Sequence, residues 1–382
     1  MINNPSKKSA RNLFTVLFIL GLVACVIPVN LAAFAFSNTQ SASIVIGQSG
    51  FTTSTGPNPP TVSSERFPRG AAFDSSGNLW ITDAQNGRVL EYLKGSGFTS
   101  GQSASIIIGR SSFTDNSTAA NPPTAASLRF PSGITFDSSG NLWVSDSANH
   151  RILEYLKGSG FTSGQSASII IGKSSFTDNS IINPPNVASE HFVQGITFDS
   201  SGNLWIGDTG NNRVLEYLKG SGFTCGQSAS LILGRSSFTD NSTAANPPTA
   251  ASVNFPQGLT FDSSGNLWVG DSFNNRVLEY LKGSGFTSGQ SASLVIGQSG
   301  FTTSTSATSQ TGLTTLEPAF NGPTFDSSGN LWVTDEINNR VLEYLGTAVS
   351  VSVPEFPFGI PIVIASMSAF YFMMRRKFSL KI

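Results

Sequence analysis

The octapeptide Phe73-Asp74-Ser75-Ser76-Gly77-Asn78-Leu79-Trp80 decides the fold of this 382-residue chain, because the chain carries five copies of it. The copies begin at Phe73, Phe136, Phe198, Phe261 and Phe325, at spacings of 63, 62, 63 and 64 residues. All five tryptophans of the protein lie in these copies. Self-similarity at such a fixed period predicts a repeat architecture.

Each copy is the centre of a larger repeated unit. An aspartate follows three residues after the tryptophan, then an asparagine, and then Arg-Val-Leu-Glu-Tyr or its isoleucine variant. Each unit contains four short β-prone runs bounded by turn residues, which in the second unit are 133–136, 141–145, 151–156 and 168–171. Four-stranded units repeated around an axis are the blades of a β-propeller. The sequence therefore predicts an all-β, five-bladed β-propeller of about 63-residue units.

The order of the strands predicts how the ring closes. The chain starts with an aliphatic run, Ile44 to Ile46, that has no blade of its own, and the last unit, 322–345, lacks an outer strand. Pairing these two segments would remove two exposed strand edges, which favour aggregation. We therefore expect the N-terminal strand to close a propeller that spans residues 41–345, flanked by hydrophobic helices at both ends of the chain.

The repeated pattern resembles the NHL repeat. A glycine-led strand, Asp-x-x-Gly-Asn-Leu-aromatic-Val, an aspartate and then Asn-x-Arg-Val is matched five times over Ser41 to Leu345. The resemblance implies an NHL-type propeller, and the family includes lyases, lactonase-like and synthase relatives, and many scaffolds that bind protein or RNA. It specifies the fold and leaves the function open, because different sites are built on the same fold.

Residues 1–36 have the composition of a secretory signal peptide. A basic start precedes an apolar run from Leu13 to Val29 and the small-residue sequence Ala33-Phe34-Ala35, after which we expect cleavage. Two alternatives stay open: a lipobox that leaves Cys25 lipidated, or retention of the segment as a signal anchor. All three interpretations place the middle of the chain outside the cell.

Residues 354–382 combine a short motif, an apolar run and a basic tail. Phe356 to Met374 is uncharged over 19 residues, enough to span a membrane as a helix, and the basic cluster after it belongs on the cytoplasmic side. With Pro354, Glu355 and Phe356 in front, this order resembles the PEF-CTERM sorting signals of archaeal surface proteins. The resemblance implies processing by an archaeosortase-like enzyme. A permanent membrane anchor is the alternative, and residues 346–353 form a short linker in both cases.

The composition excludes several function classes. Apart from the two terminal cation clusters and Glu355, the chain carries 15 Lys and Arg against 22 Asp and Glu, a net charge of −7. Nucleic-acid binding needs a basic surface, so we expect no nucleic-acid partner. The two cysteines make no disulfide framework, and the two histidines are too few and too scattered for a histidine-rich metal site.

Function is expected where the near-identical units differ, on the face that carries the long loops before each first strand. The residue ahead of each first-strand glycine should lie at the mouth of the central channel. These residues are mostly neutral hydrogen-bonding groups, namely Arg69, Ser132, Gln194, Gln257 and Asn321. We therefore expect a membrane-tethered propeller on the cell surface that binds an extracellular protein or glycan without catalysis and without a cofactor.

An extracellular enzyme is the alternative. Glu65, Glu190 and Glu317 each lie four residues before a ring position, in alternate units, and His191 stands beside one of them. Three carboxylates and an imidazole that converged on the axis would hold Ca²⁺ or Zn²⁺, as a metal-dependent lyase or lactonase-like hydrolase requires. The other interpretation of these residues is that they are charges on the loop surface.

Two N-glycosylation sequons occur in equivalent long loops. They are Asn116-Ser117-Thr118 and Asn241-Ser242-Thr243, whereas the third unit has Asn179-Ser180-Ile181 and lacks the motif. Sequons are used only in exported proteins. Glycosylation of Asn116 and Asn241 would therefore agree with the expected export.

Overall fold

The structure is a computed structural model, and the chain divides into two compact units, Met1–Ile44 and Val45–Ile382. The propeller belongs to the second unit. Residues 1–36 and 354–382, expected to be export and sorting segments, lie outside the described residues. Within the described ranges, no helix has the length and apolar character needed to cross a membrane. The described residues are 41–54, 56–115, 117, 119–240, 242–314, 323–335, 338 and 340–346.

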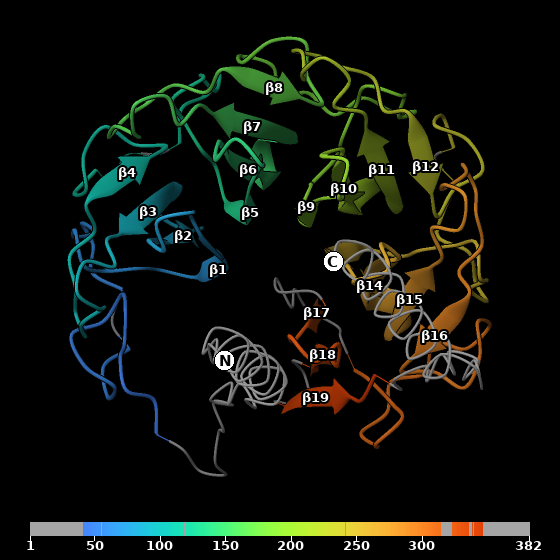
Figure 1. The fold of residues 1–382 in the computed structure, drawn as a ribbon. Helices are drawn as coiled ribbons and strands as arrows, with labels where there is room; N and C mark the ends of the chain where they lie inside the picture. Colours follow the sequence, from blue (N-terminus) through green and yellow to red (C-terminus); the bar gives the residue numbers. More distant parts are fainter. Residues whose placement is uncertain are drawn as a thin grey trace, which may run out of the picture. The chain divides into compact units, whose positions relative to one another are not determined.

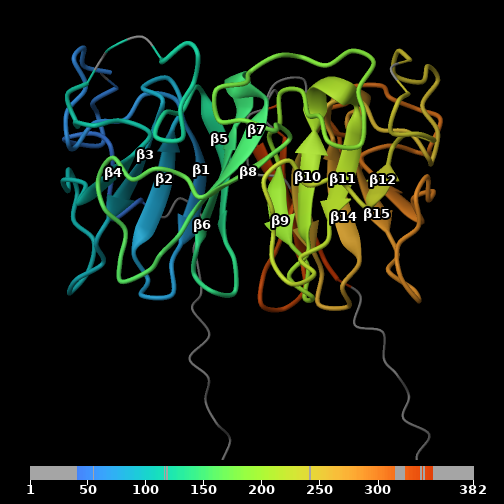
Figure 2. The ribbon, with the colours of Figure 1, turned by 90° about the horizontal axis from the view of Figure 1, so that it is seen from above.

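Five antiparallel sheets follow one another along the chain and stand around a common axis, so the fold is an all-β five-bladed propeller (Figure 1). The first strands, such as β1, β5 and β9, are innermost, and the outer strands β4, β8, β12 and β16 form the rim (Figure 1). Figure 2 shows the strands running roughly along the axis. The first blade contains β1 (Pro68–Phe73), β2 (Leu79–Asp83), β3 (Arg88–Tyr92) and β4 (Ile106–Ile108); the second β5 (Pro131–Phe136), β6 (Leu142–Asp146), β7 (Arg151–Tyr155) and β8 (Ile169–Ile171); the third β9 (Ile196–Phe198), β10 (Leu204–Asp208), β11 (Arg213–Tyr217) and β12 (Leu231–Leu233); the fourth β13 (Pro256–Phe261), β14 (Leu267–Asp271), β15 (Arg276–Tyr280) and β16 (Leu294–Ile296); and the fifth β17 (Thr324–Phe325), β18 (Leu331–Asp335) and β19 (Arg340–Tyr344).

The repeated octapeptide folds as a tight turn between the first two strands of each blade. In the first blade, Asp74 Oδ1 accepts hydrogen bonds from the backbone N–H groups of Ser76 at 2.8 Å and Asn78 at 2.9 Å. Gly77 takes a φ of 80°, a left-handed conformation that favours glycine. Asp74 Oδ2 accepts the indole N–H of Trp80 at 3.3 Å. The aspartate thus closes the turn and also orients the tryptophan.

The tryptophans join neighbouring blades. Trp80 is fully buried, and its ring meets Phe136 and Phe161 of the second blade edge-to-face, at centroid distances of 5.9 and 4.8 Å. Such aromatic pairs contribute about 0.5 to 1.5 kcal/mol each beyond their burial. Trp143, Trp205 and Trp268 make the equivalent contacts at the next three interfaces. The core is therefore a series of inter-blade clusters.

The repeated aspartate and arginine form a buried clasp at the turn between the second and third strands. Arg88 Nε donates to Asp83 Oδ2 at 2.7 Å, and Arg88 Nη2 donates to the carbonyl of Ser64 at 2.6 Å. Asp83 Oδ1 also accepts the backbone N–H of Arg66, in the loop before β1. The clasp fixes the long loop to the blade. The other pairs are Asp146–Arg151, Asp208–Arg213, Asp271–Arg276 and Asp335–Arg340.

The fifth blade differs from the expected closure. Its sheet has three strands, and residues 44–46, expected to be its outer strand, are not in strand conformation. Val45 lies against the first blade, with the contacts that the outer-strand residue Ile107 makes to Ser163 and Gly164 of the second blade. The N–H of Val45 donates to Ser100 Oγ at 3.1 Å, and its carbonyl accepts the N–H of Gly101 at 3.0 Å. The segment thus uses partners on the blade that follows it, and no described strand pairs with the outer edge of β19.

Candidate functional site

One face of the propeller carries both the turns that follow the second strands and the long loops that precede the first strands; we call it the loop face. Pro68 at the start of β1 lies opposite Asp83 at the end of β2, which brings these segments to the same end of the blade. Arg110, just after β4, donates from Nε to the carbonyl of Asn86 at 3.0 Å. The loop after each outer strand therefore joins this face, as expected from the sequence.

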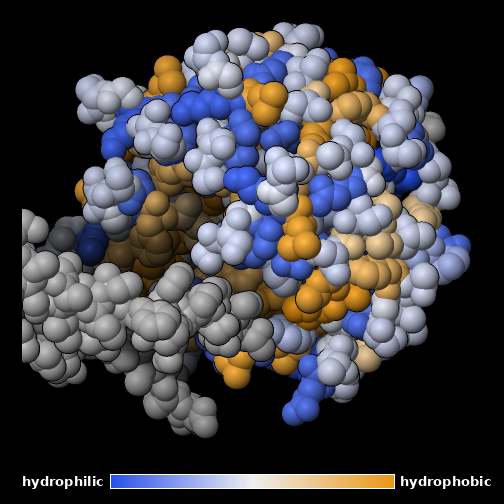
Figure 3. Space-filling view, turned by 45° about the vertical axis from the view of Figure 1, so that its right-hand side comes forward, coloured by the Kyte–Doolittle hydropathy of each residue, from blue (hydrophilic) through white to orange (hydrophobic). Residues whose placement is uncertain are grey.

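The first strands line an open cavity of about 400 Å³ at the axis. A Cβ on Gly133 would lie 2.2 Å from the carbonyl oxygen of Gln194, and one on Gly195 would lie 1.9 Å from that of Gln257. Only glycine therefore allows the first strands to approach this closely. Figure 3 shows a hollow with hydrophobic walls and hydrophilic residues along its upper edge. The cavity lining includes Gly70, Ala71, Gly133, Ile134, Gly195, Ile196, Gly258 and Leu259.

The residues expected to ring the channel mouth lie between the first strands of adjoining blades. Ser132 is buried, and its Oγ is 2.5 Å from Ser147 Oγ. Gln194 and Gln257 are also buried, and three of their amide atoms, Gln194 Oε1 and both polar atoms of Gln257, have no hydrogen-bond partner among the described residues. The Arg69 guanidinium lies over the ring of Phe130 at 4.2 Å. Asn321 is outside the described residues.

Glu65 and Glu190 occupy equivalent places in two different blades. Each is buried, and burial, followed by the charge of the neighbouring clasp aspartate, raises the pKa of Glu65 to about 7 and that of Glu190 to about 8. The Tyr217 hydroxyl donates a short hydrogen bond to Glu190 Oε1. Within the part of the chain that the structure describes, no three His, Cys, Asp or Glu side chains gather as metal ligands. Glu65, Glu190 and His191 thus form no such ligand group among the described residues. The Ca²⁺ or Zn²⁺ alternative, which also needs Glu317, stays a prediction.

The fifth unit does not place Glu317 in the same position. Thr314 donates its backbone N–H to Asp335 Oδ1 at 2.8 Å, as His191 does to Asp208 Oδ1 at 2.7 Å. Leu313, not Glu317, is therefore the equivalent of Glu190, and Leu128 and Val253 hold this position in the second and fourth units. Glu317 itself lies outside the described residues.

The two histidines, distant in sequence, lie together at the interface of the second and third blades. The rings of His150 and His191 are 5.0 Å apart and nearly perpendicular, at 69°. His150 Nδ1 accepts the backbone N–H of Phe192 at 3.0 Å. Burial, and then the charges of His191, Lys173 and Arg129, lower the pKa of His150 to about 4. A neutral imidazole therefore acts as the acceptor between these blades.

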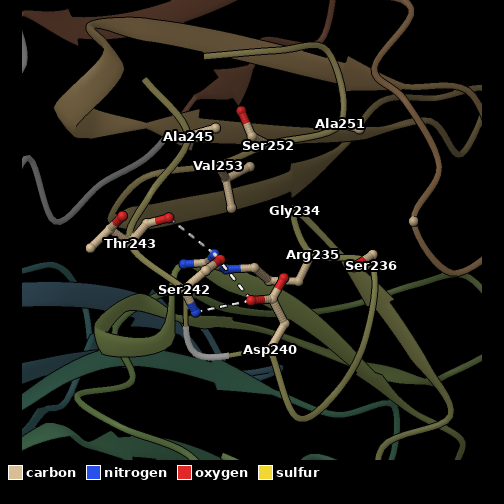
Figure 4. A pocket seen from close by; sticks show the side chains of 11 residues that line it. Gly234, Arg235, Ser236, Asp240, Ser242, Thr243, Ala245, Ala251, Ser252 and Val253 are labelled. Atoms are coloured by element: carbon tan, nitrogen blue, oxygen red, sulfur yellow. Dashed lines mark hydrogen bonds and ion pairs between the residues drawn. The ribbon is translucent and has the colours of Figure 1, made fainter. Parts of the chain in front are cut away.

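Three further cavities lie under the long loops of the loop face. Equivalent cavities of about 310 and 230 Å³ lie beside Arg235 in the fourth unit and Arg110 in the second (Figure 4 shows the first). A third, of about 270 Å³, adjoins Arg235 on the side of His191 and Ile181. Arg235 was not among the residues expected from the sequence. The sequence does carry a signal for this region, because Ile181 and Ile182 in the third unit replace the threonine and alanines of the second and fourth units. The sequon residues Asn116 and Asn241 lie outside the described residues.

Comparison with protein families supports the assignment of the repeat. The NHL repeat model matches residues 128–155 and 253–280, which contain the first three strands of the second and fourth blades. The match at these two units supports an NHL-repeat β-propeller. No curated protein matches the chain.

Solved structures with a similar fold include virginiamycin B lyase from Staphylococcus aureus, 16% identical, with a TM-score of 0.38 over 72% of this chain and 69% of that one. A streptogramin B lyase is 14% identical, with a TM-score of 0.40 over 75% and 69% of the two chains. An auxiliary nutrient binding protein from Bacteroides thetaiotaomicron is 15% identical, with a TM-score of 0.37 over 55% and 46%. At these TM-scores the likenesses carry no argument about activity or ligand.

Proposed function

We propose that this protein is a non-catalytic binding propeller of the cell surface, which binds a glycan or a segment of an extracellular protein at the axial end of its first strands. The carrying observation is the set of buried amide atoms of Gln194 and Gln257 that have no hydrogen-bond partner among the described residues. The residues that follow them, Gly195 and Gly258, line the cavity of about 400 Å³. Buried polar groups are normally hydrogen-bonded, and we expect a ligand to supply partners for these atoms. Uncharged amides suit hydroxyl and peptide groups.

The charged groups of the blades support a binding role rather than a catalytic one. The aspartate and arginine that recur in every unit form ion pairs with each other. The arginines also donate hydrogen bonds to loop carbonyls, as Arg151 does to those of Phe176, Thr124 and Ser127. Glu65 and Glu190 are buried in separate blades. These groups are used by the scaffold, and apart from Arg69 the described ring residues, Ser132, Gln194 and Gln257, are neutral.

The test is a screen of neutral oligosaccharides and peptides against the full-length protein in detergent, followed by variants. Gln257→Leu and Gln194→Leu should each weaken binding, since they remove the amide while keeping a similar volume. Ser200→Ala, in the exposed turn on the opposite face of the third blade, is the matched control. Equal binding by all three variants would place the ligand elsewhere and contradict the proposal.

We also propose that residues 1–36 direct export and that residues 354–382 hold the protein at the outer face of the membrane until an archaeosortase-like enzyme processes the Pro354-Glu355-Phe356 motif. The basic residues at the two ends of the chain support this topology, because Lys and Arg stay on the cytoplasmic side. Glycans on Asn116 and Asn241 would agree with it. Mass spectrometry of the native protein tests all three points, and an intact C-terminal tail would leave a permanent anchor.

A further inference from the structure

The departures of the third unit from the repeat converge on one cavity of the loop face, at a distance from the axis. This cavity has a volume of about 270 Å³, and its lining includes His191, Gly210, Ile181 and Ile182. The backbone bonds to the clasp aspartates show that the other units carry different residues at the position of His191, namely Arg66, Arg129, Asn254 and Thr314. In a chain of near-identical units, such a local concentration of differences marks a place with a role of its own.

Gly210 allows His191 to take its position. A Cβ on Gly210 would lie 2.5 Å from His191 Nδ1, too close for any contact between real atoms. Ile181 and Ile182 supply an apolar wall in a loop whose counterparts in the second and fourth units hold threonine and alanine, and Ile181 is 52% exposed. Exposed aliphatic side chains beside polar groups are typical of a ligand pocket.

Arg235 and Ser242 line both this cavity and the adjoining one of about 310 Å³, which Figure 4 shows. The residue is only 8% exposed. Its Nε donates to the carbonyl of Asn211 at 3.3 Å, and its Nη1 donates to Ser242 Oγ at 2.8 Å. The Asp240 carboxylate is 3.8 Å from Nη1, beyond hydrogen-bond distance. Among the described residues, nothing accepts a hydrogen bond from Nη2.

A buried cation whose counter-ion lies as far away as 3.8 Å is only partly compensated, because burial removes its hydration. Desolvation accordingly lowers the pKa of Arg235. The ion pair with Asp240, at 3.8 Å and without a hydrogen bond, offsets only part of the charge, so the remaining charge matches a monoanion better than a phosphate dianion. The planar guanidinium presents its free Nη2 donors in a geometry that suits a carboxylate.

We infer that the two cavities beside Arg235 form a binding site for a small organic carboxylate, with Arg235 Nη2 bonding to the carboxylate and Ile181 and Ile182 contacting its carbon skeleton. The site is distinct from the axial site of the proposed function and does not depend on it. An acidic sugar and the C-terminus of a peptide share this chemistry, and cavities of about 270 and 310 Å³ hold a monosaccharide or one to two amino acids.

The test uses the full-length protein in detergent and calorimetric titration with two carboxylates and their uncharged counterparts. The pairs are glucuronate with glucose, and N-acetyl-leucine with N-acetyl-leucinamide. We expect at least one carboxylate to bind more tightly than its counterpart, and Arg235→Gln to weaken that binding about tenfold or more, the usual effect of losing a charged hydrogen bond. Binding of glucuronate alone identifies an acidic sugar, and binding of N-acetyl-leucine alone identifies a peptide terminus.

Arg235→Gln should fold, because Gln298 holds the same place in the fifth unit and bonds the carbonyls of Asn275 at 2.9 Å and Thr305 at 2.8 Å. Arg110→Gln is the matched control at the equivalent cavity of the second unit, and it should leave binding unchanged. Gly210→Ala, which displaces His191, should weaken binding as well, whereas the axial variant Gln257→Leu should not. The inference is wrong if neither carboxylate binds better than its uncharged counterpart, or if the Arg110 and Arg235 variants weaken binding equally.

Discussion

The Nδ1 atom of His150 accepts the backbone N–H of Phe192 at 3.0 Å, which links residues 42 positions apart across the second and third blades. At the next interface Asn212 Oδ1 accepts the N–H of Phe255 at 2.8 Å in the same way. His150 and Asn212 both have left-handed backbones, with φ values of 56° and 54°. One of these two inter-blade bonds therefore uses an acceptor that titrates, and the other does not.

This difference predicts a dependence of stability on pH. Because the pKa of His150 falls to about 4 in the folded chain, from about 6.5 when exposed, the unfolded chain binds its proton first as the pH falls. The contribution of His150 is fully present above pH 6.5 and is lost as the pH falls to about 4. The total loss is about 3 kcal/mol. Denaturant unfolding of the wild type and of His150→Asn between pH 7 and pH 4 measures it, and the variant should not show this loss.

The reciprocal variant is the control for this prediction. Asn212→His should introduce a similar acid-dependent loss at the interface of the third and fourth blades. Both interfaces would then depend on pH, and the wild-type difference between them would disappear. An identical pH profile for the wild type and His150→Asn would show that His150 does not act as an acceptor in solution.

Glu190 predicts the opposite dependence. Its pKa is raised to about 8, first by burial and then by the charge of Asp208, so the unfolded chain loses its proton first as the pH rises. The contribution of Glu190 to the free energy of unfolding is fully present below pH 4.5 and is lost as the pH rises to about 8. Glu190→Gln keeps an acceptor for Tyr217 and removes the titration. The variant should therefore melt at a higher temperature than the wild type at pH 8, and at a similar temperature at pH 4.5.

Leu128, Val253 and Leu313 hold the position of Glu190 in other units, so Glu190→Leu is a second test of the same point. It should also be more stable than the wild type at pH 8 if the carboxylate has no structural task. A loss of stability for both variants at pH 8 would mean that Glu190 is charged and paired in the folded protein.

The buried clasps predict a difference between the third and fifth blades. Arg213 is fully buried with Asp208, whereas the side chain of Arg340, paired with Asp335 at the same 2.7 Å, is 25% exposed. Removing one partner of a buried pair leaves an uncompensated charge and costs about 3 to 5 kcal/mol. Arg213→Leu should therefore lower the free energy of unfolding by this amount, and Arg340→Leu by clearly less. Chemical denaturation measures both, and equal losses would contradict the assigned burial.

The repeated octapeptide predicted the five blades because its information is local. Asp74, Gly77 and Trp80 lie within seven residues of one another and form the turn. The turn also orients Trp80 toward Phe136 of the next blade. Equivalent positions in loops of unequal length carry no such information. Counting back from a glycine selected Glu317, while the hydrogen bond of Thr314 to Asp335 shows that Leu313 is the true equivalent.

The candidate site was harder to predict for two physical reasons. The pairing register of β5 with β6 shifts between Pro131 and Ile134, and such an irregularity changes the direction of the side chains at this point. The ring residues thus lie at blade interfaces, which a regular strand does not predict. The approach of His150 to His191 depends on the packing of two blades, and their separation of 41 residues in the sequence gives no sign of it.

The last prediction concerns the edge of the fifth blade. Val341 in β19 is 57% exposed, whereas the equivalent Val277 in β15, which is covered by β16, is 2% exposed. Val341→Lys should therefore change the free energy of unfolding by no more than about 0.5 kcal/mol. It should also reduce self-association, because charge on an open edge blocks pairing with another chain.

Val277→Lys is the matched control for this edge. It places an unpaired charge between two strands, so it should destabilise the fourth blade by several kcal/mol. Thermal unfolding and light scattering of both variants separate the two effects. If Val341→Lys proves as destabilising as Val277→Lys, then β19 is covered in solution, and the segment that has the matching sequence for an outer strand is residues 41–46. That outcome would restore the closed ring expected from the repeat.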